Sequence, residues 1–313
     1  MILDFRGFRA LALGGLVAVA AGCPQPHQVS VTMKGPVTAE SEAGAPAEAG
    51  SASAPAGYGN LFGQITLDGA APEVKFLHRK GDGAVKDSTV CAAEDTPDES
   101  IVVNAANKGL ANVVVYLDKA PAGIKPELAT PPSEPVVFDQ KGCRFLPHIV
   151  AVRVGQPIHI LSDDGVPHNT HTFPDRNPGF NQGISPNERK GVPLVYVKAE
   201  QKPLKVTCDY HAWMTAYHFP IDHPYFAVTD ADGKFKIPGL PAGKHVLKIW
   251  HEKVGGDGFL DRKITVEIKA DADTEQNLTY APAKFAGLEV QTPTIALSEL
   301  KSGRLRPLSV ESK

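Results

Sequence analysis

The chain has 313 residues but only 4 Cys, 3 Met and 2 Trp. It has no apolar stretch of about 18 residues, the length that an α-helix needs to cross a bilayer, which excludes a multi-span membrane protein. It also has no long run of lysine and arginine, and its net charge is −3, so its charge does not favour binding to nucleic acid. With 42% hydrophobic residues and this small net charge, the chain is not disordered throughout.

Glycine and proline, in contrast, are abundant, with 29 and 27 residues. This composition predicts many turns and short strands rather than long helices. Residues 150–154 and 264–268 alternate between apolar side chains and others, a pattern typical of half-buried strands. No segment of ten or more residues begins like a helix. We therefore expect an all-β chain of the sandwich type.

The first 22 residues have the pattern of a secretory signal. Arg6 and Arg9 precede an apolar run of 12 residues at 10–21, which is too short to cross a bilayer. An Ala-Ala-Gly triplet before Cys23 resembles the bacterial lipobox, in which the cysteine is lipidated and becomes the new N-terminus. An ordinary cleaved signal is the alternative. Both predict export to the periplasmic or cell-surface side of a bacterial membrane, and a lipidated Cys23 would anchor the chain without spanning the membrane.

A tether is expected between this anchor and the folded part. Residues 39–57 contain only Ala, Glu, Ser, Gly and Pro. Such a segment has nothing to bury and is expected to stay flexible. We therefore expect a domain that stands off a membrane and reaches a partner.

Metal-binding chemistry is concentrated in two short segments. One contains His168, and the other follows a predicted strand at 204–208 and reads Cys208, His211 and Met214 in a Cys-x2-His-x2-Met motif. A thiolate, two imidazoles and a weak thioether form the ligand set of a blue-copper electron-transfer site. The sulfur donors are soft and favour Cu(I), whereas imidazole also binds Cu(II). Such a set suits a metal ion that changes its oxidation state.

These segments resemble the cupredoxins, with amicyanin and plastocyanin as the nearest likeness. The first histidine of that family lies in a Pro-His-Asn sequence, as at 167–169, and amicyanin has the same short Cys-x2-His-x2-Met spacing. The resemblance covers residues 136–222 and implies a Greek-key β-sandwich with one mononuclear type 1 copper. It implies the metal ligands His168, Cys208, His211 and axial Met214. Around them it implies Asn169, which ties the two ligand loops together, with Thr207 as its partner.

Other metal centres fit these residues less well. Zinc would accept the cysteine and both histidines, but the methionine argues against it. A purple-copper site needs a second cysteine where Leu204 stands. Multicopper oxidases have a histidine on each side of the thiolate, where this chain has Thr207 and Asp209. We therefore expect no enzyme but an electron carrier, whose partner is a redox protein such as a c-type cytochrome or a dehydrogenase. The alternative is a non-redox copper store or a cell-surface interaction module.

The remaining cysteines, Cys91 and Cys143, are expected to form a disulfide, because an even number of cysteines remains in an exported protein. A metal site of Cys143 and His148 is the alternative. Trp213 lies between two copper ligands in the sequence and is a candidate for an apolar rim on which a partner docks, with a place in the core as the alternative. Three other histidines are expected to be hydrogen-bonded structural residues, with an accessory metal or partner site as the alternative: His218, His223 and His251.

The segments on either side of the copper domain resemble a carboxypeptidase regulatory-like domain, a small transthyretin-type sandwich. Residues 63–69 resemble its opening strand and residues 229–243 its closing half. The resemblance implies a structural or adhesive module without peptidase activity, into which the copper domain is inserted or to which it is fused. The expected parts are a signal peptide 1–22, lipidated cysteine and tether 23–57, regulatory-like sandwich 58–135, cupredoxin domain 136–222, closing part of the sandwich 223–281 and tail 282–313.

Overall fold

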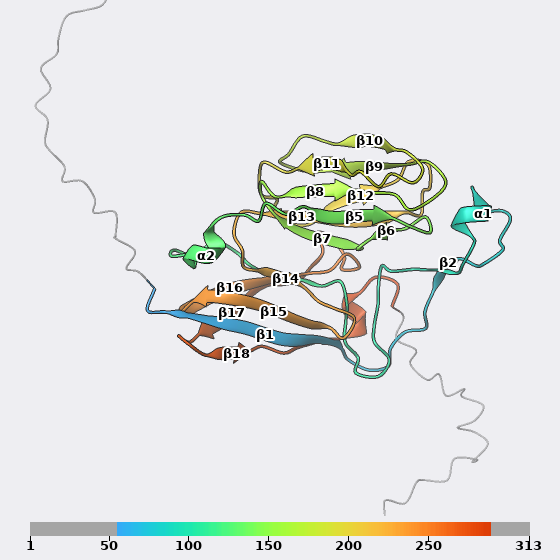
Figure 1. The fold of residues 1–313 in the computed structure, drawn as a ribbon. Helices are drawn as coiled ribbons and strands as arrows, with labels where there is room; N and C mark the ends of the chain where they lie inside the picture. Colours follow the sequence, from blue (N-terminus) through green and yellow to red (C-terminus); the bar gives the residue numbers. More distant parts are fainter. Residues whose placement is uncertain (1–54, 289–313) are drawn as a thin grey trace, which may run out of the picture. The chain divides into compact units, whose positions relative to one another are not determined.

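The structure is a computed structural model, and it describes residues 55–288 (Figure 1). The expected signal peptide, Cys23, nearly all of the tether and most of the tail lie outside the described residues. Strands dominate, and the helices of residues 55–288 are α1 (Ser88–Cys91), α2 (Pro126–Ala129) and the 3-10 helix η1 (Pro282–Lys284). None of them has the length and apolar character to cross a membrane. The prediction of an all-β chain is confirmed.

Two sheets are built entirely from residues 136–221. One has the strand order β10-β9-β12-β13-β7, and the other has the order β11-β8-β5-β6. Their strands are β5 (Val136–Gln140), β6 (Phe145–Leu146), β7 (Ile149–Arg153), β8 (Pro157–Ile160), β9 (His168–Phe173), β10 (Asn181–Ile184), β11 (Val192–Val195), β12 (Leu204–Thr207) and β13 (Thr215–Ile221). Both sheets contribute to one buried core, with Phe138 and Ile158 from one and Val150 and Val206 from the other.

The register of β9 and β12 positions the predicted metal ligands. The two strands are antiparallel neighbours, and Thr207 lies opposite His171. His168 is the first residue of β9, and residues 208–214 form the loop from β12 to β13. The start of β9 and the end of β12 therefore lie side by side at the same end of the sheet, which brings the two ligand segments together.

The second sandwich is built from strands on either side of residues 136–221. One sheet contains β1 (Tyr58–Leu67), β15 (Lys234–Pro241), β18 (Asp273–Glu275) and β19 (Leu278–Tyr280). The other contains β4 (Val114–Leu117), β14 (Phe226–Val228), β16 (Gly243–Trp250) and β17 (Phe259–Ile268). Since β4 pairs directly with β14, residues 136–221 are inserted between two neighbouring strands of this sandwich.

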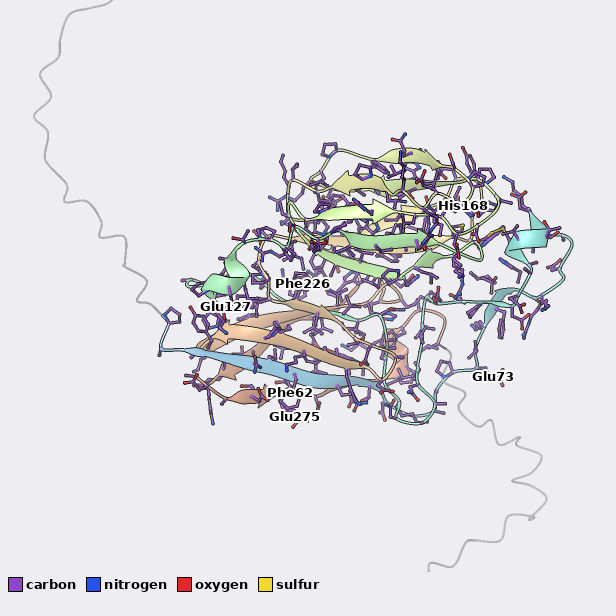
Figure 2. All side chains as sticks on the ribbon, in the orientation of Figure 1. Phe62, Glu73, Glu127, His168, Phe226 and Glu275 are labelled. Atoms are coloured by element: carbon purple, nitrogen blue, oxygen red, sulfur yellow. A yellow bond between two sulfur atoms is a disulfide. The ribbon has the colours of Figure 1, made fainter. Side chains whose placement is uncertain are left out.

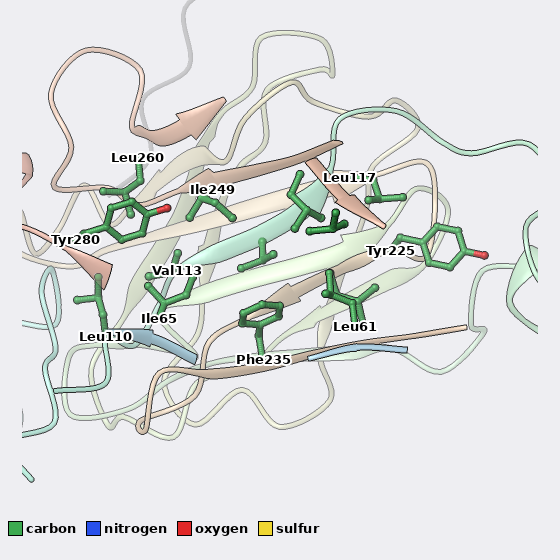
Figure 3. Close-up of a cluster of buried hydrophobic side chains, with 14 of the residues drawn as sticks. Leu61, Ile65, Leu110, Val113, Leu117, Tyr225, Phe235, Ile249, Leu260 and Tyr280 are labelled. Carbon is green, nitrogen blue, oxygen red and sulfur yellow. The ribbon is translucent and has the colours of Figure 1, made fainter. Parts of the chain in front are cut away.

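The core of the second sandwich follows from a period-2 pattern. Every second residue of β1 is buried, and Leu61 and Ile65 pack with Phe235 and Ile249 (Figure 3). Gly63 lies on the buried face of β1, where a Cβ atom would collide with the backbone carbonyl of a neighbouring segment. This position therefore requires glycine. Phe285 is also buried in this core, so the sandwich continues beyond the expected boundary at residue 281.

A third element, which we call the arm, comprises residues 76–97. It contains the strand β2 (Phe76–His78), the helix α1 and the strand β3 (Thr96–Pro97), and β2 pairs with β3 apart from the four sheets (Figure 1). The pair Arg79–Asp95, with 2.9 Å between nitrogen and oxygen, also holds its two ends together. The sequence predicts these residues to be part of the regulatory-like sandwich. In the structure they contact the predicted copper ligands instead.

Candidate metal centre

Three donor atoms of the predicted ligands converge in the interior. His168 Nδ1 lies 3.0 Å from His211 Nδ1, and Cys208 Sγ lies 3.9 and 3.7 Å from these two nitrogens. All three side chains are buried. A point in the plane of this triangle is about 2.1 Å from each of the three atoms, close to the bond lengths of roughly 2.0–2.3 Å between a metal ion and nitrogen or sulfur. The three side chains therefore have the spacing of ligands to one ion. Figure 2 labels His168 among the side chains of the domain.

Each imidazole is held on its other nitrogen by a carboxylate. His168 Nε2 lies 2.9 Å from Asp164 Oδ2, and His211 Nε2 lies 2.9 Å from Asp87 Oδ2. An Nε2–H that donates to a carboxylate leaves Nδ1 free to bind a metal ion, which is a common arrangement around metal-bound histidine. Two Nδ1 lone pairs at 3.0 Å repel each other unless a proton or a cation lies between them. The donor set therefore fits a metal ion at this point.

Met214 is held at the same place by the turn of its own loop. Its N–H donates to His211 O at 2.9 Å, and its carbonyl accepts from Cys208 N at 3.3 Å. The side chain is buried in the same hydrophobic cluster as Cys208. The tight turn thus brings the residue expected as axial ligand next to the other three.

Electrostatics favour the thiolate. Burial raises the pKa of Cys208, but its contacts with His168 and His211 and the N–H of Asn169, 3.5 Å from Sγ, outweigh burial and lower the pKa to about 6. Burial also disfavours a charge on His168, but Asp164 and Cys208 outweigh it and raise the pKa of His168 to about 9. Without a metal ion, the centre is therefore a thiolate beside an imidazolium, and a bound cation would take the place of that positive charge.

Asn169 joins the two ligand loops, but through a different partner from the one expected. Its Oδ1 accepts from Asp209 N at 2.6 Å, and its Nδ2 donates to Asp209 Oδ2 and Asn181 Oδ1, both at 2.8 Å. Thr207 is not its partner among the residues that the structure describes. The register explains this correction, because Thr207 lies opposite His171, and the same register continued by two residues places Asp209 opposite Asn169.

The cysteines outside this centre form the predicted disulfide between Cys91 and Cys143. This excludes the alternative metal site of Cys143 and His148, because the sulfur is already bonded and His148 pairs with Glu252. The disulfide lies against the metal centre: both of its sulfur atoms and a ring nitrogen of His211 lie within 4.8 Å of one another.

The other candidate histidines are buried and form hydrogen bonds within the folded domains. His218 Nδ1 lies 2.9 Å from Tyr196 Oη, and His223 Nε2 lies 3.2 Å from Leu117 O. His251 Nδ1 accepts from the N–H of Lys253 at 3.2 Å. Across residues 55–288, no cluster of three possible metal-binding groups contains any of these three histidines. The hydrogen bonds agree with the expected structural role of these histidines, and the described residues give no support to the alternative of an accessory metal site.

Trp213 lies between the ligand loop and the arm. Its Nε1 donates to Cys143 O at 3.1 Å, and its ring packs against the rings of His211 and His78, with centroid distances of 5.2 and 4.8 Å. The side chain is half-buried. The indole therefore braces the centre, and its part in docking a partner stays a prediction.

Sequence reasoning missed the two carboxylates. Asp164 lies four residues before His168, in a segment already recognised, so its spacing was an available signal. Asp87 lies 124 residues before His211, in a segment with no metal-binding pattern of its own. Only the fold of the arm brings it to the centre.

No family model matches the chain, and no curated protein matches it. Solved structures that are similar to a part of the chain include the following three. A Cu-containing nitrite reductase from Thermus scotoductus SA-01 matches with 17% identity and a TM-score of 0.26, over 31% of this chain and 26% of its own. The chain thus spans about a quarter of that enzyme. A purple cupredoxin from Nitrosopumilus maritimus matches with 16% identity and a TM-score of 0.23, over 28% of this chain and 99% of its own. A reduced amicyanin variant matches with 16% identity and a TM-score of 0.25, over 28% of this chain and 82% of its own.

Proposed function

We propose that the chain is a type 1 copper protein that transfers single electrons between redox partners. The observation that carries this proposal is the triangle of three buried donors, Cys208 Sγ and the Nδ1 atoms of His168 and His211, at separations of 3.0–3.9 Å. A copper ion bound there would supply a centre that gains and loses one electron. Two imidazoles, a thiolate and a weak thioether form the donor set of such centres.

The residues around the donors suit electron transfer rather than catalysis. The ligand side chains are between 0% and 2% exposed, so water and small substrates have no direct access to the centre. The carboxylates of Asp87 and Asp164 hold the two rings in place. Fixed ligands limit rearrangement when the oxidation state changes, and the buried Met214 thioether is a soft donor that favours Cu(I). We therefore propose a carrier and not an enzyme.

The setting of this carrier is part of the same proposal. The signal-like start, the lipobox-like sequence at Cys23 and the tether composition support an exported protein that is held at a bacterial membrane by a lipid anchor. A tethered carrier of this kind would exchange electrons with an exported redox protein, such as a c-type cytochrome or a dehydrogenase. The second sandwich would then serve as the structural or adhesive module that its sequence resembles.

The test is a titration of the purified chain with Cu(II), followed by visible and electron paramagnetic resonance spectra. We expect an intense blue thiolate-to-copper band with a narrow copper hyperfine splitting, which Cys208→Ala abolishes. His171→Ala is the matched control, since His171 lies in the same strand as His168 but is partly exposed and bonded to Asp209. It should keep the colour. Copper bound without colour, and equally well by Cys208→Ala, would instead indicate a metal-binding or interaction module.

A further inference from the structure

The arm closes the outer side of His211. The His211 ring is 0% exposed although it lies in a loop, and the group that its Nε2 contacts is the carboxylate of Asp87, 2.9 Å away. Asp87 belongs to the arm, outside the sandwich that carries the other ligands. The carboxylate itself is about one-third exposed, so it forms the boundary between the buried ring and the solvent.

The backbone of Asp87 is fixed in an uncommon conformation. Its φ of 54° and ψ of 40° lie in the left-handed region, which few residues other than glycine, asparagine and aspartate adopt. Its carbonyl accepts from the N–H groups of Val90 and Cys91, both at 2.9 Å, and so begins α1. The last residue of α1 is Cys91, which is bonded to Cys143. The carboxylate is thus presented by one short turn that a disulfide fastens to the copper domain.

Further contacts bind the arm to the ligand loop. Lys86 Nζ donates to Tyr210 O at 3.1 Å, directly before His211 in the chain. The ring of His78 packs edge-on against Trp213, and its Nε2 lies 3.0 Å from Cys91 O. The arm therefore contacts the residues on both sides of His211.

The same disulfide is connected to the support of the other histidine. Asp164, which holds His168, accepts from the N–H groups of Gly142 at 2.6 Å and Cys143 at 2.8 Å. One end of the disulfide thus fixes Asp164 and the other end fixes Asp87. The two carboxylates that orient the two imidazoles are joined through one covalent bridge.

We propose that Asp87 is a positioning residue for His211, and that the arm, fastened by Cys91–Cys143, is a working part of the metal centre. This inference rests on the proposed function. A carboxylate that accepts from Nε2–H fixes both the tautomer and the orientation of the ring and makes Nδ1 a stronger donor. Loss of such a partner typically lowers metal affinity by about 10- to 100-fold.

Two substitutions at Asp87 distinguish the effect of the carboxylate from the effect of the backbone conformation. Asp87→Asn and Asp87→Gly both remove the charge, and both residues tolerate the left-handed conformation. Glu94→Gln is the matched control, because Glu94 is an arm residue that pairs with Lys80 and is 80% exposed. We expect a 10- to 100-fold loss of copper affinity in Asp87→Gly, a smaller loss in Asp87→Asn, whose amide oxygen still accepts, and wild-type affinity in Glu94→Gln.

A double variant tests the fastening. Cys91→Ser with Cys143→Ser leaves Asp87 in the sequence but frees the helix that presents it. We expect a loss of copper affinity in the same direction as in Asp87→Gly, together with a changed hyperfine splitting. Wild-type affinity and spectra in the double variant would overturn the role of the disulfide.

A readout without copper separates this inference from the proposed function. Nitrogen-15 shifts of the metal-free wild type should show His211 with a proton on Nε2, and Asp87→Gly should lose this fixed tautomer. A wild type that binds no copper would defeat the proposed function, while the nitrogen shifts still decide the Asp87–His211 contact. An Asp87→Gly protein with unchanged affinity, hyperfine splitting and His211 tautomer would overturn the proposal.

Discussion

His168 Nδ1 and His211 Nδ1 lie 3.0 Å apart, while the other nitrogen of each ring contacts a carboxylate. The two rings therefore present their free nitrogens to each other. In the metal-free protein a proton on His168 satisfies this contact, in keeping with a pKa of about 9 for that residue. A metal ion can bind only if it displaces this proton.

Copper binding should accordingly release protons in a pH-dependent way. At about pH 7.5, His168 carries a proton and Cys208, with a pKa of about 6, is already a thiolate. We expect about one proton released per copper ion at that pH, approaching two below pH 6 and falling toward zero above pH 9. Calorimetry in two buffers with different ionisation enthalpies measures this number. Binding at pH 7.5 without proton release would contradict the charge state described above.

Asn169→Ala should destabilise the fold without removing the metal ligands. The substitution deletes three hydrogen bonds, to Asp209 N, Asp209 Oδ2 and Asn181 Oδ1. We expect a loss of about 2–3 kcal/mol in the free energy of unfolding, measured by denaturant titration. The blue band should remain but shift, since the N–H that reaches Cys208 Sγ belongs to the backbone.

Asn177→Ala is the matched control for Asn169→Ala. The Asn177 side chain also bridges two segments, with Lys198 and Glu200 among its partners, but these residues do not belong to the metal centre. It should lose a comparable stability and leave the spectrum unchanged. A spectral shift of the same size in both variants would show that general loosening, and not the link between the ligand loops, alters the copper site.

The convergence of the four proposed ligands could be predicted from the sequence because they lie in two short segments with characteristic spacing. His168 begins one strand, and Cys208 to Met214 fill one turn, so local pattern and antiparallel pairing are enough to bring them together. The alternation at 264–268 likewise predicts a strand with one buried face, as found in β17. These features depend on neighbours in sequence or on a single pair of strands. The alternation at 150–154 was misleading, because β7 is buried on both faces, with Val150 and Val152 in one core and Ile149 in another.

Asp87 could not be predicted in this way. Its contact with His211 spans 124 positions and depends on where the arm folds back, which the disulfide at Cys91 and the pairing of β2 with β3 determine. The expectation that Thr207 is the partner of Asn169 failed for a related reason. Thr207 is adjacent to Cys208 in sequence, but strand register and not adjacency decides which side chain faces Asn169. The facing residue follows from the pairing of two strands that are distant in the sequence, and adjacency to Cys208 does not reveal it.

Substitution of Met214 should change the reduction potential while the blue colour persists. An axial thioether favours Cu(I), whereas an amide oxygen is a harder donor and favours Cu(II). We expect Met214→Gln to lower the midpoint potential and Met214→Leu, which removes the donor but keeps the buried apolar volume, not to lower it. Each tenfold change in the relative affinity for the two oxidation states corresponds to about 59 mV. Spectroelectrochemical titration provides the measurement, and equal potentials in all three proteins would exclude Met214 as an axial ligand.

Acid should destabilise the fold through two buried neutral histidines. Burial lowers the pKa of both His218 and His251 to about 3, whereas an unfolded chain has a histidine pKa of about 6.5. The unfolded state therefore binds more protons below pH 6.5, and the stability that is present above that pH is lost as the pH falls. Each histidine should contribute up to about 1.4 kcal/mol per pH unit.

Urea unfolding of the metal-free protein between about pH 6 and pH 4.5 tests this slope, and the difference between wild type and His218→Phe separates the histidine from Cys208, whose pKa of about 6 lies at the upper end of this range. His218→Phe should reduce the slope by up to about 1.4 kcal/mol per pH unit, since a ring that packs edge-on against Phe138 is retained while the titrating group is lost. A slope unchanged by His218→Phe would mean that the unfolding transition does not expose this histidine to protons.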